Sequence, residues 1–218
     1  FHTGFGLDRD GDSIYLFESA ENGGKLVDHV RFGAQLRGRS ISRTGPDNRF
    51  ALTLPTPLAK NSDPLPLRDQ KDLVINEWLA SNGVVYDNDF IEIYNSGNYP
   101  VSIGGMTITD DPNNIPDLFR VIDLSFIDSK GYVKFIADGD PDQGPSHLNF
   151  GLSKLYDQIG LFDDKGNVID RVSHVNAQDD VSIGRSEEGG ILLSSFSLPT
   201  PGYSNDTDLA EEVQIIQD

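Results

Sequence analysis

Short apolar runs that alternate with polar residues dominate this chain, and clusters of Gly, Asn, Asp and Pro separate them. A period of two is typical of β-strands with one buried face, and no segment shows a sustained helical period of 3.6 residues. In the second part of the chain the pattern predicts strands at Leu73–Ala80, Phe90–Tyr94, Val101–Ile108, Phe119–Leu124, Tyr132–Ala137, Gln158–Phe162, Val168–Val172, Val181–Arg185 and Ile191–Phe196.

Seven to nine short strands in about 135 residues predict an all-β sandwich or barrel. The alternation also predicts which side chains face the core. These are Ile91, Ile93, Ile159, Leu161, Ile183 and Leu192, together with Trp78 in the first of these strands.

The first sixty residues recur near the end of the chain. Residues 1–7 resemble residues 146–152, and Asp12–Phe17 matches Asp157–Phe162 at the same offset of 145. Three further blocks match in the same order: Leu26–Val30 with Val168–Val172, Ser40–Arg43 with Ser182–Arg185, and Leu54–Pro57 with Leu198–Pro201. Ordered matches indicate a duplicated module. We call residues 1–61 the first repeat and residues 146–205 the second repeat.

The first repeat contains only about the last four strands of such a module, too few to bury its inner face. We therefore expect it to be completed by an upstream segment, by another chain or by its neighbour, and favour the upstream segment. The predicted organisation is a partial sandwich at 1–61, a linker at 62–71 with two prolines, a complete domain at 72–205 and an acidic tail at 206–218. A short helix is expected around residues 209–213.

The net charge of −18 is unevenly distributed. Residues 1–62 hold eight Lys or Arg and seven Asp or Glu, whereas the remainder holds nine and twenty-eight, a net of −19. So acidic a block argues against nucleic acid as a partner. Five arginines of the first block form either a patch for an acidic surface or dispersed solubilising charge: Arg31, Arg37, Arg39, Arg43 and Arg49. The chain has no Cys and no long apolar run, so we expect neither disulfides nor membrane insertion.

Two groups of alternating carboxylates are candidate calcium ligands. Asp8, Asp10 and Asp12 form the first group, which lacks the Gly and bidentate Glu of an EF-hand loop. The second group is Asp138, Asp140 and Asp142. The alternative for the first group is a solvated hairpin turn, and the alternative for the second group is a rigid acidic loop.

Sequence signals for catalysis are absent. The four histidines lack the short spacings typical of zinc sites, and the chain has neither a G-x-S-x-G elbow nor a phosphate-binding glycine loop. We therefore expect a protein that is not an enzyme.

Several strings resemble the lamin tail domain family in its bacterial form. They are Leu73–Asn82, Phe90–Asn95, Val101–Met106, Thr109–Pro112, Asn149–Leu152, Val168–Val172, Ser182–Arg185 and Pro199–Gly202. Together they cover about residues 72–205, and the later ones recur in 1–61. The sequence departs from the family pattern at Phe90, where an indole is usual.

The resemblance implies an immunoglobulin-like β-sandwich, a non-catalytic role and a place in a larger bacterial secreted or cell-surface protein. It implies a spacer or docking surface for a protein partner or for domains of the same protein. The alternative is a module that binds carbohydrate or another polymer for an enzyme domain outside this chain.

Overall fold

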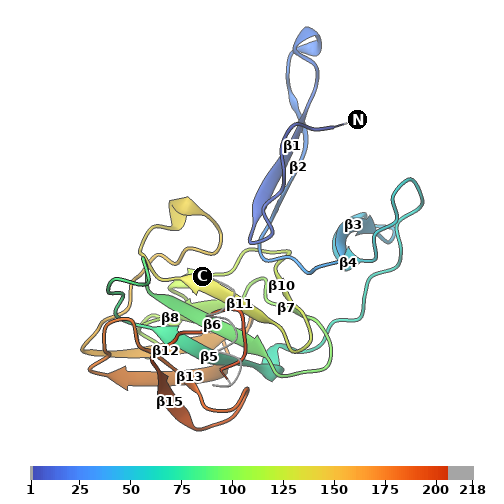
Figure 1. Cartoon of the computed structure of the whole chain (residues 1–218). Helices are drawn as coiled ribbons and strands as arrows, with labels where there is room; N and C mark the ends of the chain where they lie inside the picture. The colour runs from blue at the N-terminus through green and yellow to red at the C-terminus, as the bar shows by residue number, and fades with distance from the viewer. Residues whose placement is uncertain (1, 206–218) are drawn as a thin grey trace.

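The computed structural model describes residues 2–205 and is built from β-strands (Figure 1). The predicted tail at 206–218, with its helix, lies outside the described residues. The strands of the first repeat are β1 (Asp12–Phe17), β2 (Leu26–Phe32), β3 (Ser40–Thr44) and β4 (Arg49–Thr53). Next come β5 (Leu73–Leu79), β6 (Phe90–Asn95), β7 (Val101–Ser102), β8 (Thr107–Thr109), β9 (Phe119–Arg120), β10 (Phe126–Ile127) and β11 (Tyr132–Ile136). The second repeat forms β12 (Tyr156–Phe162), β13 (Val168–Val175), β14 (Ser182–Arg185) and β15 (Leu193–Phe196). Short 3₁₀ turns lie at Ala20–Asn22, Gln70–Asp72 and Pro141–Gln143.

Residues 67–205 form an immunoglobulin-like β-sandwich. One sheet has the order β11-β6-β5-β14-β15 and the other β13-β12-β8-β9, with the β7–β10 pair beside them. Trp78 is fully buried between the sheets, and its indole N–H donates to Nδ1 of His174 at 3.0 Å. Strands β5 and β6 are buried along nearly their whole length because the second repeat covers them. We call residues 67–145, which supply β5–β11, the front segment.

The first repeat forms two hairpins that stand away from the sandwich (Figure 1). Only their base is attached: the Phe126 amide donates to the Ala34 carbonyl at 2.9 Å, and Gln35 Nε2 donates to the Leu124 carbonyl at 2.7 Å. A small apolar cluster around Leu36, Leu52 and Phe126 lies at this junction. The hairpins therefore have a defined anchor but no second layer among the described residues.

Most of the predicted strands are confirmed, and three predictions are wrong. The expected strand Val101–Ile108 is broken by Gly104 and Gly105, the second of which has φ +82°. The expected strand Phe119–Leu124 ends at Arg120, and Leu124 takes a positive φ. Leu192 is 70% exposed because the turn before β15 carries it outward, whereas Ile91, Ile93, Ile159 and Leu161 are fully buried as predicted.

The predicted linker at 62–71 packs against its neighbours. The Leu65 amide donates to the Leu52 carbonyl, and the Arg68 amide donates to the Pro100 carbonyl. Between residues 2 and 205 the structure contains no helix with the length and hydropathy of a membrane span.

Candidate interaction surface

The two repeats have the same strand register. In the first, Ile14 lies opposite Val30, and a bulge follows Leu16. In the second, Ile159 lies opposite Val172, and the bulge again follows the matching residue, Leu161. A bulge alters the twist of a strand pair and is a specific feature of a fold, so the duplicated sequence builds the same hairpin twice.

Local hydrogen bonds are repeated as well. The Asp12 carboxylate accepts from the amides of Asp8 and Ser13, and the matching Asp157 accepts from the amides of Ser153 and Gln158. These bonds link residues close in sequence and form without the front segment.

An Arg–Asp pair joins the second and third strands of each repeat. In the second repeat, Arg185 and Asp170 lie 2.5 Å apart with side chains only 8% and 16% exposed. The pair also holds β5, because the Ile75 amide donates to Asp170 at 2.8 Å and Arg185 Nε donates to the Ile75 carbonyl at 2.9 Å.

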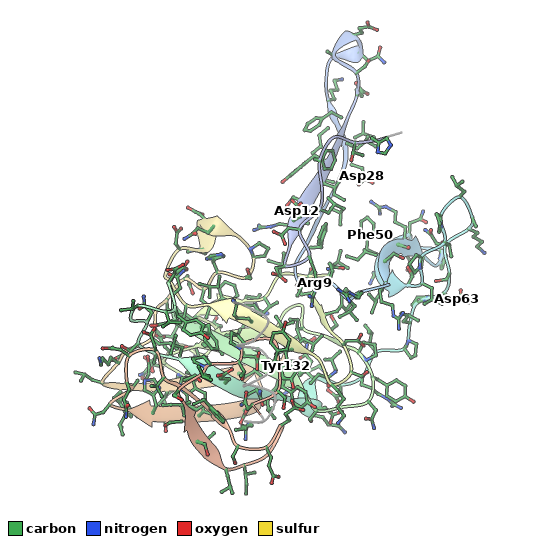
Figure 2. The ribbon with its side chains drawn as sticks, viewed as in Figure 1. Arg9, Asp12, Asp28, Phe50, Asp63 and Tyr132 are labelled. Atoms are coloured by element: carbon green, nitrogen blue, oxygen red, sulfur yellow. The ribbon has the colours of Figure 1, made fainter. Side chains whose placement is uncertain are left out.

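The first repeat contains the matching pair, Asp28 and Arg43, but no strand in residues 2–205 takes the place of β5 beside it. Arg43 Nη2 contacts both carboxylate oxygens of Asp28 at 2.9 Å, and the two side chains are 42% and 48% exposed. The Arg43 hydrogen bond lowers the pKa of Asp28. Figure 2 shows Asp28 on its hairpin, with Phe50 on the facing one.

The segments that close the two repeats, residues 54–61 and 198–205, also match. We call each of them the closing segment of its repeat. The Asn205 side chain donates to the Arg185 carbonyl at 3.0 Å, and the Asn61 side chain donates to the Arg43 carbonyl at 3.0 Å. The Leu58 φ of +63° matches the left-handed turn at Gly202, where φ is +92°. Leucine rarely adopts a positive φ, so this turn is held in the conformation that the closed repeat uses.

In the second repeat this closing segment binds two buried acids of the front segment. The Thr200 amide donates to Glu77, and the Gly202 amide donates to Glu92. Burial, opposed by the Gly202 and Asn76 hydrogen bonds, raises the pKa of Glu92 to about 8, and burial also raises the pKa of Glu77. Thr56 and Leu58 match Thr200 and Gly202 in the first repeat. Within the described part of the chain, their backbone amides have no carboxylate partner.

The inner surface of the first repeat is consequently open. We define the open face as Ile14, Leu16, Val30, Ile41 and Phe50, together with the Asp28–Arg43 pair. Leu16 is 58% exposed, whereas the matching Leu161 is fully buried. A groove of about 420 Å³ lies between the two hairpins, lined by Ile14, Val30, Ile41 and Phe50 among others.

The predicted calcium ligands have other contacts. Asp8 accepts from the Asp10 amide, and Asp12 accepts from the Asp8 amide. Figure 2 places Asp12 near the base of its hairpin. Within residues 2–205 no three His, Cys, Asp or Glu side chains are positioned to share a metal ion.

The second group, Asp138, Asp140 and Asp142, lies around a 3₁₀ turn. Asp138 accepts from the Asp140 amide at 3.0 Å and from His147 at 2.7 Å. Burial acts to raise the pKa of Asp138, but these two contacts together lower it. Calcium binding stays a prediction for both groups.

Comparison with known families identifies the sandwich. The model of the lamin tail domain matches residues 67–176. The chain belongs to the lamin tail domain family. The match covers the front segment and the first hairpin of the second repeat, and this confirms the resemblance and the immunoglobulin-like fold. A comparison with curated proteins found no match.

The lamin tail match ends at Asn176, before β14, β15 and the closing segment. The Arg185–Asp170 pair and the Glu77–Glu92 pair were not predicted from the sequence. A signal for the first was present, because Asp28 and Arg43 recur as Asp170 and Arg185 in the aligned repeats. Nothing in the sequence showed that Glu77 and Glu92 would be buried together.

Proposed function

We propose that this chain is a non-enzymatic structural and interaction module of a larger secreted or cell-surface bacterial protein. In this proposal the first repeat is the later half of a second lamin tail domain, and its open face is the docking surface. The exposure of Leu16 is the observation that carries the proposal, because the matching side chain in the complete domain, Leu161, lies in the hydrophobic core. Exposed apolar patches with ordered surroundings are typical of interaction sites.

Site-specific photo-crosslinking in the producing cells tests docking. A photoreactive residue replaces Leu16 on the open face, and a control chain carries it at Leu155, which is exposed on the second repeat. We expect Leu16 to crosslink to one defined polypeptide segment and Leu155 to give no such product. Absence of a crosslink from Leu16 would show that the face is not a docking surface in the cell.

A polymer-binding module is the second candidate, and one observation favours it. On the outer side of the first hairpin, Tyr15 stacks with Phe17 at 6.3 Å and with His29 at 6.0 Å between ring centroids. Exposed aromatic rings suit stacking on sugar rings. If this candidate is correct, Tyr15→Ala weakens retention on insoluble polysaccharide at least tenfold, whereas Ile14→Ala does not.

Calcium binding by either acidic group is a separate proposal that calorimetry tests. Heat and a rise in melting temperature at millimolar Ca²⁺, both lost in Asp10→Asn or in Asp140→Asn, would assign the site. No heat and no shift would remove calcium from the account.

A further inference from the structure

We propose that the open face of the first repeat binds the front half of a lamin tail domain. The occupant is a group of strands similar to residues 67–145. It is not residues 67–145 themselves, either from the same chain or from a second copy. This inference rests on the proposed docking function and names the occupant. It follows from what covers the matching residues in the second repeat.

Two unpaired strand edges define the shape of the occupant. In the complete domain, β14 pairs with β5 through Ile183 and Trp78, and β12 pairs with β8 through Gly160 and Thr109. In the first repeat, the matching edges of β3 and β1 pair with nothing else in residues 2–205, since each hairpin is a separate two-stranded sheet. Open edges bind additional strands through backbone hydrogen bonds. The occupant must therefore supply two strands, one for each edge.

Polar groups at the open face specify the chemistry of the first of these strands. By analogy with Ile75, the Asp28–Arg43 pair offers one acceptor for the backbone N–H and one donor for the backbone C=O of a single residue. The Asn61 carboxamide matches Asn205, whose oxygen accepts from the Asn76 side chain at 3.3 Å. These groups fit a strand with Asn followed by Glu, as in Asn76 and Glu77.

The amides of the closing segment specify a second acid. Thr56 and Leu58 match Thr200 and Gly202 in sequence, and Leu58 shares the positive φ of Gly202. The Thr200 and Gly202 amides donate to Glu77 and Glu92. In β5 and β6, Glu77 lies directly opposite Glu92. The occupant therefore also contains a hairpin with an acid on each strand, as β5 and β6 of the front segment do.

Residues 67–145 cannot cover both repeats at once. Residues 2–205 contain this one front segment and two repeats able to receive it. If a front segment moved to a first repeat, in the same chain or by exchange between chains, it would uncover a second repeat. One of the two repeats would remain open, so an occupant that leaves both repeats closed is a segment other than residues 67–145.

Charge favours the same occupant. The front segment holds five Lys or Arg and fourteen Asp or Glu, a net of −9. The first repeat has a net charge of +1, whereas the second repeat holds four Lys or Arg and eight Asp or Glu, a net of −4. A front half as acidic as residues 67–145 therefore meets less repulsion on the first repeat than on the second.

A fusion of the full chain tests the proposal. Because Phe1 matches Ser146, a copy of residues 67–145 is joined directly to Phe1. We expect amide hydrogen exchange in residues 14–17 and 40–44 to slow at least a hundredfold. We also expect Arg43→Ala in the fused chain to reverse most of this protection, since it removes the contact with the added strand. Unchanged exchange, with residues 67–205 still protected, would overturn the proposal.

A disulfide identifies which repeat the added segment binds. The natural chain has no Cys, and Tyr15 matches Gly160, the partner of Thr109. Tyr15→Cys should oxidise with a Cys placed at the added copy of Thr109, whereas Val27→Cys on the neighbouring strand should not. A failure to crosslink, or protection of the unfused chain that appears only when it dimerises, would contradict this occupant. A Leu16 crosslink in cells to an unrelated sequence would leave docking intact and overturn this inference alone.

Discussion

The two repeats have the same strand pairing and opposite environments. Ile14 and Ile159 each lie opposite a valine in a hairpin with the same bulge, but only Ile159 is fully buried. The Asp28–Arg43 and Asp170–Arg185 pairs likewise make the same contact between matching residues and differ in exposure. Hairpin register and local polar contacts therefore depend on the repeat itself, whereas burial depends on the front segment. Four substitutions or pairs of substitutions test this difference.

The largest expected effect is at the Arg–Asp pair. Arg185→Ala leaves the Asp170 carboxylate without its cation and the Ile75 carbonyl without its arginine donor inside the sandwich, and we expect a loss of about 3–5 kcal/mol in the free energy of unfolding. Arg43→Ala should leave it unchanged, because solvent replaces the lost contact. Urea unfolding followed by the fluorescence of Trp78, the single tryptophan, and by circular dichroism measures both. Equal losses would mean that the first repeat is already closed.

Core truncation comes next. Ile159→Ala removes a fully buried side chain and should cost about 3 kcal/mol. Ile14→Ala removes its half-buried match and should cost less than about 1 kcal/mol. The same unfolding assay applies, and a large loss from Ile14→Ala would contradict the open state of the first repeat.

The pH dependence of stability should come from the complete domain, in which the second repeat covers Glu92 of the front segment. The pKa of Glu92 is about 8 in the folded protein, above its value of about 4.3 in an unfolded chain. The folded state therefore binds more protons than the unfolded state. The stability that Glu92 contributes in this way is complete below pH 4 and is lost as the pH rises toward 8.

Glu92→Gln tests this dependence. Relative to this variant, the wild type should lose up to about 1.4 kcal/mol per pH unit between pH 5 and 8. Urea titrations at four pH values measure the difference between the two proteins. Parallel pH profiles would show that Glu92 is ionised in the folded state.

The smallest expected effect is at the closing turn. Gly202→Ala places a Cβ at φ +92° and should cost about 1 kcal/mol. Leu58→Gly relieves the matching strain in the first repeat. We expect slower amide exchange in residues 55–61, with no change in the unfolding of the sandwich. Faster exchange in this segment would show that the left-handed turn is not retained in solution.

Local pattern in the sequence was enough for much of the fold. Alternation predicted buried residues in β6 and β12, because in each strand apolar residues recur at every second position between clear turns. The ordered match of the repeats predicted that hairpins would recur. The alternation failed at Gly104–Gly105 and at Leu192, where a positive φ or a turn changes the direction of the side chains that follow.

The candidate surface was only partly predictable. The deficit of strands in residues 1–61 predicted an incomplete sandwich from chain length alone. The polar groups that select the occupant were not found, because their roles depend on contacts between residues more than ninety positions apart, such as Ile75 with Asp170. Periodicity does not report such contacts.

Amide hydrogen exchange on the unmodified chain tests the central claim most directly, because it compares the two repeats within one molecule. We predict that residues 14–17 and 40–44 exchange at least a hundredfold faster than residues 159–162 and 182–185, since their strand edges and inner face are open. Equal protection of the two repeats in the monomeric chain would contradict the account.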